Sequence, residues 1–142
     1  MFSKACEYGI KAVLYICFQS QLGNRVGLKE IAEAIDSPRA FTGKIMQQLS
    51  KNQIVQSIKG PSGGFWMEED NRKKINIKSI VEVLDGGDIY VKCGLGLEQC
   101  NNSNPCPMHS EYTALREGLI KLHTDSSIED LAKKLNGKAT LK

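Results

Sequence analysis

The chain has 142 residues, which suits one domain with one appendage, and its 41% hydrophobic content is enough for a buried core. No apolar run is long enough to cross a bilayer, so we expect no membrane partner. No cleavable signal opens the chain, so we expect a cytoplasmic location. This compartment is reducing, and stable disulfides are therefore not expected.

The net charge is only +3, but residues 1–80 hold 12 Lys or Arg against 7 Asp or Glu, while residues 81–142 hold 7 against 9. Residues 37–67 contain cations and no acidic side chain, which is typical either of a phosphate-facing surface or of an ordinary solvated face.

The first part of the chain is predicted to contain a helix-turn-helix. Apolar residues recur at three- and four-residue steps over residues 3–22, which predicts a helix in which Cys6 and Cys17 are packed small side chains rather than ligands. A turn at residues 22–25 precedes a second helix over residues 28–35. A third helix follows after a tight turn, and this pair of short helices predicts the helix-turn-helix.

The third helix is predicted to begin with Ser37 as N-cap and Pro38 at the first helical position, and to end near Lys51. Its apolar side chains share one side, and the other side carries small, amide and cationic groups: Ala40, Gly43, Lys44, Gln47 and Lys51. Such a side is typical of a helix that lies in a major groove, where amides meet base edges and cations meet phosphates. We therefore predict base contacts from Thr42 and Gln47. Phosphate contacts are predicted for the basic side chains Arg39, Lys44, Lys51 and Lys59.

A β-hairpin is predicted directly after the helix-turn-helix. Residues 54–59 and 65–67 have strand character, and the turn between them is rich in glycine. A hairpin in this position is a wing, with Lys59 at its tip to enter a minor groove or contact a phosphate. The alternative, a loop that cradles a nucleotide phosphate, lacks both the P-loop pattern and the strand–loop–helix order.

The rest of the chain is expected to contain short elements and one long helix. A charged turn is expected at residues 68–74, a short strand at Ile75 and Ile77, and a fourth helix with Ile80, Val81 and Leu84 that ends at residues 85–87. A helix over residues 107–123 carries one apolar seam that is typical of dimerisation: Tyr112, Leu115, Leu119 and Leu122. Ser126 and Glu129 match a capping box for a last short helix, and a frayed tail is expected at residues 138–142.

The expected units are a winged helix-turn-helix DNA-binding domain (1–85), a cysteine-rich loop (86–109), and a dimerisation helix with a C-terminal helix (107–137).

Three cysteines and a histidine lie within 17 residues of turn-forming sequence: Cys93, Cys100, Cys106 and His109. A polar loop rich in Gly and Asn is a poor place to bury thiols, and a reducing compartment disfavours disulfides, so metal or cluster binding is the favoured interpretation. Zinc sites usually bring cysteines in close pairs, whereas the gaps here are six, five and two residues, which modestly favours an iron–sulfur cluster. Glu7 on the first helix is either solvated or able to reach the metal site of a partner.

The order of these features resembles the iron–sulfur cluster regulator family of bacterial winged-helix repressors. The resemblance rests on the residues 51–55, KNQIV, which lead into the wing sequence KGPSGGF at residues 59–65, and on the three cysteines before the long helix. It implies a mainly α fold with a small β-hairpin, and a homodimer on a palindromic double-stranded DNA operator. It also places Pro61 and Gly63 in the DNA-binding wing.

The same resemblance implies a cluster, of 2Fe-2S rather than 4Fe-4S type, held by Cys93, Cys100 and Cys106. His109 matches a fourth ligand three residues after the last cysteine, and Glu7 of the other subunit is the alternative. Two departures stand out: the first cysteine gap is six residues where five is usual, and Gly43 replaces a glutamate that gates operator choice. A zinc-stabilised repressor without redox sensing is the alternative function. An enzyme is not expected, because no C-x-x-C pair and no base beside a cysteine are present.

Overall fold

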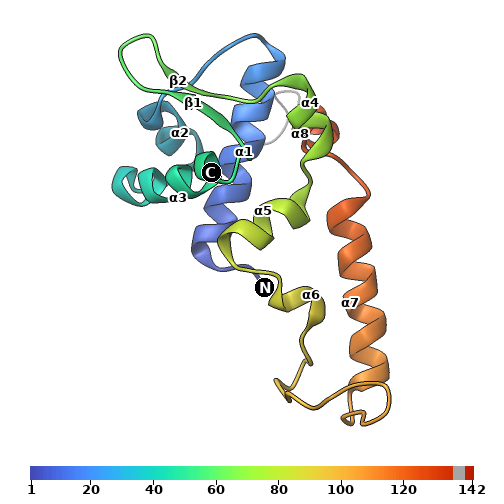
Figure 1. Cartoon of the computed structure of the whole chain (residues 1–142). Helices are drawn as coiled ribbons and strands as arrows, with labels where there is room; N and C mark the ends of the chain where they lie inside the picture. The colour runs from blue at the N-terminus through green and yellow to red at the C-terminus, as the bar shows by residue number, and fades with distance from the viewer. Residues whose placement is uncertain (136–139) are drawn as a thin grey trace.

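The computed structural model describes residues 1–135 and 140–142. Its elements in chain order are α1 (Lys4–Gln21), α2 (Leu28–Ile35), α3 (Arg39–Lys51), β1 (Gln56–Ile58), β2 (Gly64–Trp66), α4 (Glu69–Lys74), α5 (Ile77–Leu84), α6 (Asp88–Val91), α7 (His109–Thr124) and α8 (Ile128–Leu135). The predicted fold class is confirmed, because the described chain is mostly helical with one antiparallel two-stranded hairpin. Figure 1 shows α1 to α5, the hairpin and α8 gathered in one body, from which α7 extends to the cysteine loop at its far end.

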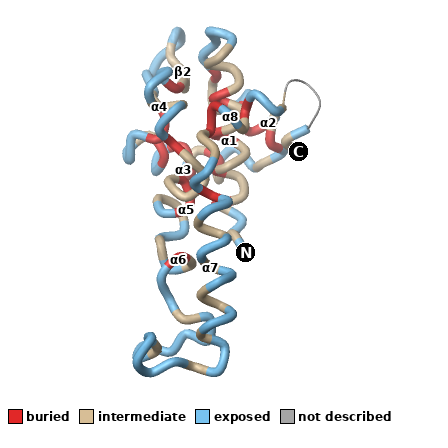
Figure 2. Tube along the Cα trace, turned by 90° about the vertical axis from the view of Figure 1, so that its right-hand side faces the viewer, coloured by how far each residue is buried: buried red, intermediate tan, exposed pale blue. Residues whose placement is uncertain are grey.

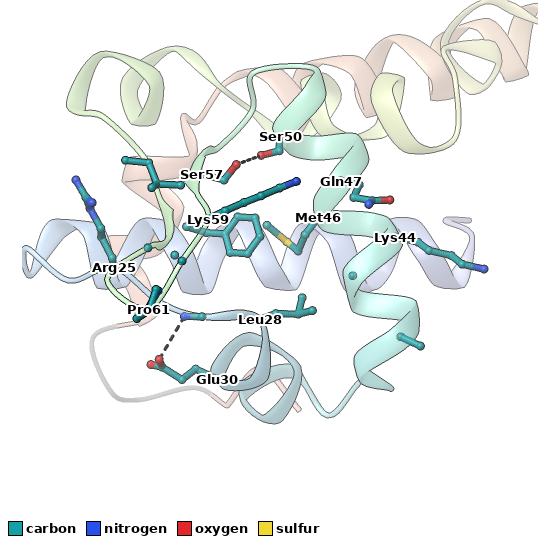
Figure 3. Close-up of a pocket in the computed structure, with 18 residues that line it drawn as sticks. Arg25, Leu28, Glu30, Lys44, Met46, Gln47, Ser50, Ser57, Lys59 and Pro61 are labelled. Carbon is teal, nitrogen blue, oxygen red and sulfur yellow. Dashed lines mark hydrogen bonds between the residues drawn. The ribbon is translucent and has the colours of Figure 1, made fainter.

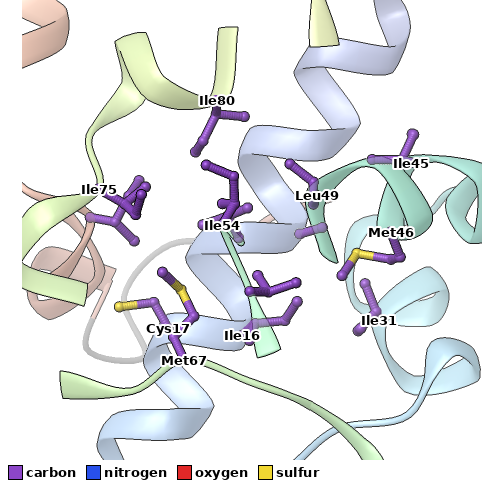
Figure 4. Packing of buried hydrophobic residues seen from close by; sticks show 14 of the residues in the cluster. Ile16, Cys17, Ile31, Ile45, Met46, Leu49, Ile54, Met67, Ile75 and Ile80 are labelled. Atoms are coloured by element: carbon purple, nitrogen blue, oxygen red, sulfur yellow. The ribbon is translucent and has the colours of Figure 1, made fainter. Parts of the chain in front are cut away.

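The core of this body is built around α1. Four residues of α1 share one buried stripe, as the three- and four-residue spacing predicts: Ala12, Val13, Ile16 and Cys17. Ile31 from α2 and Met46 and Leu49 from α3 pack against this stripe, as Figure 4 shows. Burying these side chains orients the helix-turn-helix, so that the opposite side of α3 faces solvent.

The wing is short and closely joined to the turn before α2. The hairpin pairs Gln56 with Trp66 and Ile58 with Gly64, and its five-residue loop begins at Lys59. Val26 and Phe65 exchange two backbone hydrogen bonds of 3.0 and 2.8 Å, which fixes the wing beside the start of α2. Residues of the hairpin and of α3 line the same hollow, so the two elements face each other across it.

The last helix, α8, returns to the body after α7. Ile128 and Ala132 are fully buried in the same core as α1. A largely buried ion pair adds to this contact, because Arg72 Nε lies 3.2 Å from Glu129 Oε1 while Arg72 also donates to the carbonyl of Met67. The start of α8 thus connects α1, α4 and the segment that leaves the wing.

A second, smaller cluster joins α7 to the body. Cys6, Val81 and Tyr90 are buried there, with Leu119 and Ile120 of α7 packed against them. Figure 2 shows that buried residues concentrate in the upper body, whereas the far half of α7 and the cysteine loop are mostly exposed or half-buried. The loop is therefore held mainly through its contacts with α7.

Several predictions about local structure were wrong. Residues 69–74 form α4 instead of a turn. The middle of this polar helix is tied to the body by hydrogen bonds from the side chains of Asn71 and Arg72, and the helix has no apolar stripe to reveal it. Ile75 and Ile77 form no strand: the Ile75 carbonyl accepts a bond from the Ile128 amide, and Asn76 caps α5, which begins at Ile77. The short helix α6 was not predicted.

The caps of two helices also differ from prediction. Pro38, not Ser37, is the N-cap of α3, so that the helix begins at Arg39. The capping box of α8 lies one residue later than predicted, because Ser127 and Asp130 exchange the two capping bonds. The long helix begins at His109 rather than at residue 107. The predicted unit 107–137 ends within residues 136–139, and the tail that was expected to be frayed starts at residue 138, so both of these boundaries lie outside the described residues.

Candidate nucleic-acid interface and metal centre

A hollow of about 850 Å³ lies between α3, the wing and the start of α2. Figure 3 shows Lys44 and Gln47 projecting from α3, with Arg25 and Pro61 across the hollow from them. Lys59 and Gly63 line the same hollow. Five of the eight predicted DNA-binding residues are thus brought together on one concave, positively charged surface, which we call the α3–wing groove. Its lining has the mixture of cations and an amide that contacts phosphates and base edges.

The remaining predicted cations lie at the two ends of α3. Arg39 is exposed in the first turn of α3 and Lys51 is exposed in its last turn. Neither lines the groove, but both extend the basic surface along the helix. The structure therefore groups all four predicted phosphate-binding cations along α3 and the tip of the wing.

The position of Thr42 contradicts the base contact that was predicted for it. Its side chain is fully buried, and its hydroxyl donates to the Pro38 carbonyl at 2.9 Å and pairs with the Ser37 hydroxyl at 2.8 Å. A threonine can satisfy its hydroxyl within the preceding turn and pack its methyl group inward. The prediction of a base contact from Thr42 is wrong for this reason, and Gln47 is left as the amide that faces the groove.

Glycine is required in the wing for the shape of the hairpin itself. A Cβ atom on Gly63 would lie 2.0 Å from the Ile58 carbonyl oxygen, which no real side chain tolerates. Gly64 has φ of +135° and would place a Cβ 2.9 Å from the Val26 carbonyl. By contrast, a Cβ on Gly43 would meet Leu28 at an ordinary 3.5 Å, so the fold does not demand glycine in α3.

Arg25 is a groove residue that the sequence reading missed. It precedes the hairpin contact at Val26 and stacks on Trp66, with its guanidinium 4.1 Å from the ring centroid. The Trp66 indole N–H donates to Glu68 at 2.7 Å, so this ring is occupied within the wing rather than free to stack on a base. Arg25 lies outside the acid-free stretch that drew attention to the other cations, and only the fold brings it to the groove.

The three loop cysteines converge. The sulfur atoms of Cys93, Cys100 and Cys106 all lie within 4.8 Å of one another, and those of Cys93 and Cys106 are 3.6 Å apart. Two thiolates on one tetrahedral metal with bonds of about 2.3 Å lie about 3.8 Å apart. The arrangement therefore suits two thiolates on one metal atom, whether zinc or an iron of a cluster, with the third thiol beside them.

His109 adds a nitrogen next to this group. Its Nδ1 atom lies 3.2 Å from Cys100 Sγ, and its Nε2 atom lies 2.9 Å from Asn102 Oδ1. His109 is the first residue of α7, so the helix start brings it toward the loop. The donor set of three sulfurs and one imidazole nitrogen matches soft-metal and iron–sulfur chemistry.

Hydrogen bonding and desolvation shift the pKa values of two loop thiols in opposite directions. The backbone amides of Leu97 and Leu95 donate to Cys93 and lower the pKa of its thiol to about 7. Desolvation raises the pKa of the Cys106 thiol instead. The Cys106 amide donates to Cys100 Sγ at 3.4 Å, so backbone groups help to hold the sulfurs together.

Two contacts with α7 hold the loop. The Tyr112 ring lies so close to Gly94 that a Cβ there would meet a ring carbon at 2.7 Å. Arg116 donates to the Lys92 carbonyl at 2.9 Å, just before Cys93. The start of the loop is therefore attached to the first and second turns of α7.

The other candidate groups lie elsewhere. Glu7 lies on α1, pairs with Lys4 at 3.3 Å and is not a member of the cysteine group of the same chain. Cys6 and Cys17 are fully buried in the body, as predicted for packed side chains. Burial raises the pKa of each of these two thiols to about 12. Along the described chain, no helix is both long and apolar enough to cross a membrane.

A helix-turn-helix with a wing, a basic groove between them and a long helix beyond defines the class of DNA-binding transcription regulators, not enzymes. Within this class, the chain belongs to the Rrf2 family, whose model is described as an iron-dependent transcriptional regulator and matches residues 2–134.

The similarity to known regulators extends over most of this chain and most of each relative. A protein of Aquifex aeolicus whose name is "Putative HTH-type transcriptional regulator" is 32% identical over 133 residues, which cover 92% of this chain and 90% of the relative. The regulator IscR of Xenorhabdus nematophila is 27% identical over 127 residues, which cover 89% of this chain and 76% of that protein.

Solved structures support the same fold. The structure of CymR, described as the global cysteine regulator of B. subtilis, matches with a TM-score of 0.78 at 21% identity and covers 94% of this chain and 97% of that one. T. potens IscR matches with a TM-score of 0.72 at 18% identity, covering 99% and 92% of the two chains. At these identities the likeness concerns the fold alone.

Proposed function

We propose that this chain is a cytoplasmic, homodimeric transcription repressor whose binding to a palindromic operator depends on an iron–sulfur cluster. Cys93, Cys100 and Cys106 would hold the cluster, with His109 as the fourth ligand. When bound, the cluster would supply a centre that responds to redox state, nitric oxide or cluster supply. The three-part division into DNA-binding domain, cysteine loop and dimerisation helix belongs to this proposal.

The observation that carries the proposal is the convergence of three thiols in an exposed polar loop. Their sulfurs lie within 4.8 Å of one another although the loop offers no apolar core to gather them. Half-buried thiols brought together in this way outside an apolar core are typical of metal ligands. The IscR relative and the family description as iron-dependent regulators agree with this interpretation.

The route from the loop to DNA runs through α7. Arg116 and Tyr112 attach the loop to this helix, and α7 packs on α5 and α6 beside the DNA-binding body. Holding the three thiols together fixes the ends of the loop, and releasing them allows it to change shape. A change in operator affinity requires that the two loop states favour different positions of the paired domains.

The apolar seam of α7 supports the homodimer. Leu115 and Leu122 are 68% and 72% exposed in the single chain. With Tyr112, Leu119 and Ile89 they line a hollow of about 360 Å³. Exposed leucines of this kind in a continuous row are typical of an interface between two protein surfaces. Pairing through this seam would place two α3–wing grooves on one duplex, which suits a palindromic operator.

The test begins with protein purified without air. We expect iron and sulfide in comparable amounts and a visible absorption band, both of which Cys100→Ala should abolish. Cys17→Ala, which removes a buried thiol of the body, is the matched control and should leave the band intact. An unchanged spectrum in Cys100→Ala would reject this cysteine as a ligand.

The second measurement couples the metal to DNA. A duplex that the protein selects from a random pool is titrated with holo protein and with chelated protein. We expect the two forms to differ in affinity, because the loop is held in only one of them. Equal affinities would refute metal control of DNA binding. Zinc without sulfide in the purified protein would instead support the alternative, a zinc-stabilised repressor without redox sensing.

A further inference from the structure

The four residues between Cys100 and Cys106 that begin at Asn101 form a closed turn. Asn101 and Asn104 exchange backbone hydrogen bonds of 3.2 and 3.1 Å. The Asn101 carboxamide oxygen accepts from the amides of Ser103 and Asn104 at 2.8 and 2.9 Å. Asn104 also donates to the Gln99 carbonyl at 3.2 Å. Asn101 and Asn104 thus build the turn, and the side chain of Asn102 is left free for another contact.

Asn102 uses this freedom to contact His109. Its Oδ1 atom lies 2.9 Å from His109 Nε2, and within the described residues its side chain makes no other hydrogen bond. With the carboxamide oxygen of Asn102 toward the ring, this contact is a hydrogen bond when the neutral imidazole carries its proton on Nε2. The opposite tautomer would require the Asn102 amide to turn over and present its NH₂ group to Nε2.

The other nitrogen of the ring is then fixed as well. With the proton on Nε2, Nδ1 carries the lone pair, and it lies 3.2 Å from Cys100 Sγ. Asn102 therefore selects the tautomer whose free lone pair faces the thiol group. Ligating histidines in metal proteins commonly donate their other N–H to an oxygen acceptor that fixes tautomer and ring orientation.

We propose that Asn102 is a positioning residue that makes Nδ1, and not Nε2, the metal-binding atom of His109. This inference rests on the proposed function, because it assigns the atom through which the fourth ligand would act. It also explains the Asn-rich turn: two asparagines shape it and the one between them orients the histidine. His109 is thereby prepared as a ligand before any metal arrives.

The first test measures the tautomer in metal-free, full-length protein. The chain has only two histidines, so long-range ¹H–¹⁵N spectra are simple, and His109→Gln assigns the signals. At about pH 8, where an ordinary imidazole is neutral, we expect His109 to be protonated on Nε2 in the wild type. Asn102→Leu should produce a mixture of tautomers. Asn102→Asp, which keeps an acceptor oxygen, should restore the wild-type tautomer.

Two controls make the result specific. His123, whose Nδ1 lies 2.8 Å from the Tyr90 hydroxyl in the buried second cluster, should be unchanged in every variant. Ser103→Ala alters the same turn without touching His109 and should keep the wild-type tautomer. An unchanged His109 tautomer in Asn102→Leu would overturn the inference.

The second test uses protein loaded with iron and sulfide without air. We expect Asn102→Leu to lose iron to a chelator about tenfold faster than the wild type, and Asn102→Asp to lose it at nearly the wild-type rate. If the wild type takes up neither iron nor sulfide, the proposed function fails, while the tautomer measurement still decides the role of Asn102. If the wild type is loaded and Asn102→Leu matches it in both experiments, only the present inference fails.

Discussion

The charge of the α3–wing groove makes a quantitative prediction about DNA affinity. Lys44 and Lys59 line the groove from its two walls, and both are exposed, so replacing them with glutamine removes charge without disturbing the core. Arg39 and Lys51 extend the same surface. If each of these four cations neutralises one phosphate, the proposed dimer makes about eight contacts, and log K falls against log salt with a slope of about −7.

The double variant Lys44→Gln, Lys59→Gln removes four of these contacts per dimer. The slope should therefore fall to about −3.6. Between about 50 and 200 mM salt, the wild type should lose roughly 10⁴-fold in affinity and the variant only about 10²-fold. The measurement is fluorescence anisotropy of a labelled duplex of random sequence at five or six salt concentrations, because this electrostatic term does not depend on the operator.

A matched control separates the groove from the charge of the whole chain. Lys133 and Lys134 are exposed on α8 and line no part of the groove, so their double replacement with glutamine removes the same charge. We expect its slope to stay near the wild-type value. Equal slopes for the two double variants would refute the assignment of the groove as the phosphate-binding surface.

Three further predictions concern the fold and the thiols. Glu129→Gln should lower the free energy of unfolding in urea by about 3 kcal/mol, because Arg72 would keep its charge with only 15% of its side chain exposed. Gly63→Ala should weaken DNA binding roughly tenfold with little change in melting temperature, since a Cβ 2.0 Å from a wing carbonyl must displace the hairpin. Alkylation of metal-free native protein at about pH 8 should label three of the five cysteines, as counted by mass spectrometry. Cys6 and Cys17 stay unlabelled because a pKa of about 12 leaves roughly one thiolate in ten thousand at that pH.

Each of these predictions has its own control. Glu69 pairs with Lys73 on the surface, and Glu69→Gln should leave the urea midpoint unchanged; an equal loss in both variants would count against the buried pair. Gly87→Ala, where a Cβ has ordinary contacts, should preserve DNA binding. All five cysteines should react in urea. Labelling of more than three in the native state would mean that the body opens far more readily than its packing indicates.

The elements with strong periodicity were predictable from the sequence. The stripe of α1 and the boundaries of α2 follow from apolar spacing, and the wing follows from its glycines. The helix α4 was not predictable, because six polar residues carry no apolar period. The capping box of α8 was ambiguous, since Ser126 with Glu129 and Ser127 with Asp130 both match the pattern, and only the ion pair to Arg72 decides between them.

The candidate site was predictable in its ligand types but not in its geometry. Cysteine spacing in a turn-rich loop predicts convergence, and the three sulfurs do converge. The direction in which Thr42 points depends on whether its hydroxyl is satisfied within the helix turn, which spacing does not reveal. Asn102 and Arg25 depend on a turn conformation and on a hairpin contact, and both arise from backbone geometry that no residue pattern encodes.

The position of α8 has a consequence for how the protein is made. Ile128 and Ala132 complete the core around α1, yet they lie near the end of the chain. While the polypeptide emerges from the ribosome, α2 and α3 can cover part of the apolar stripe of α1, but the part that packs on Ile128 and Ala132 stays uncovered until α8 has been translated. A product that is truncated before α8 would thus expose this apolar surface and be degraded by proteases. It would not persist as a partly active protein that competes for promoters.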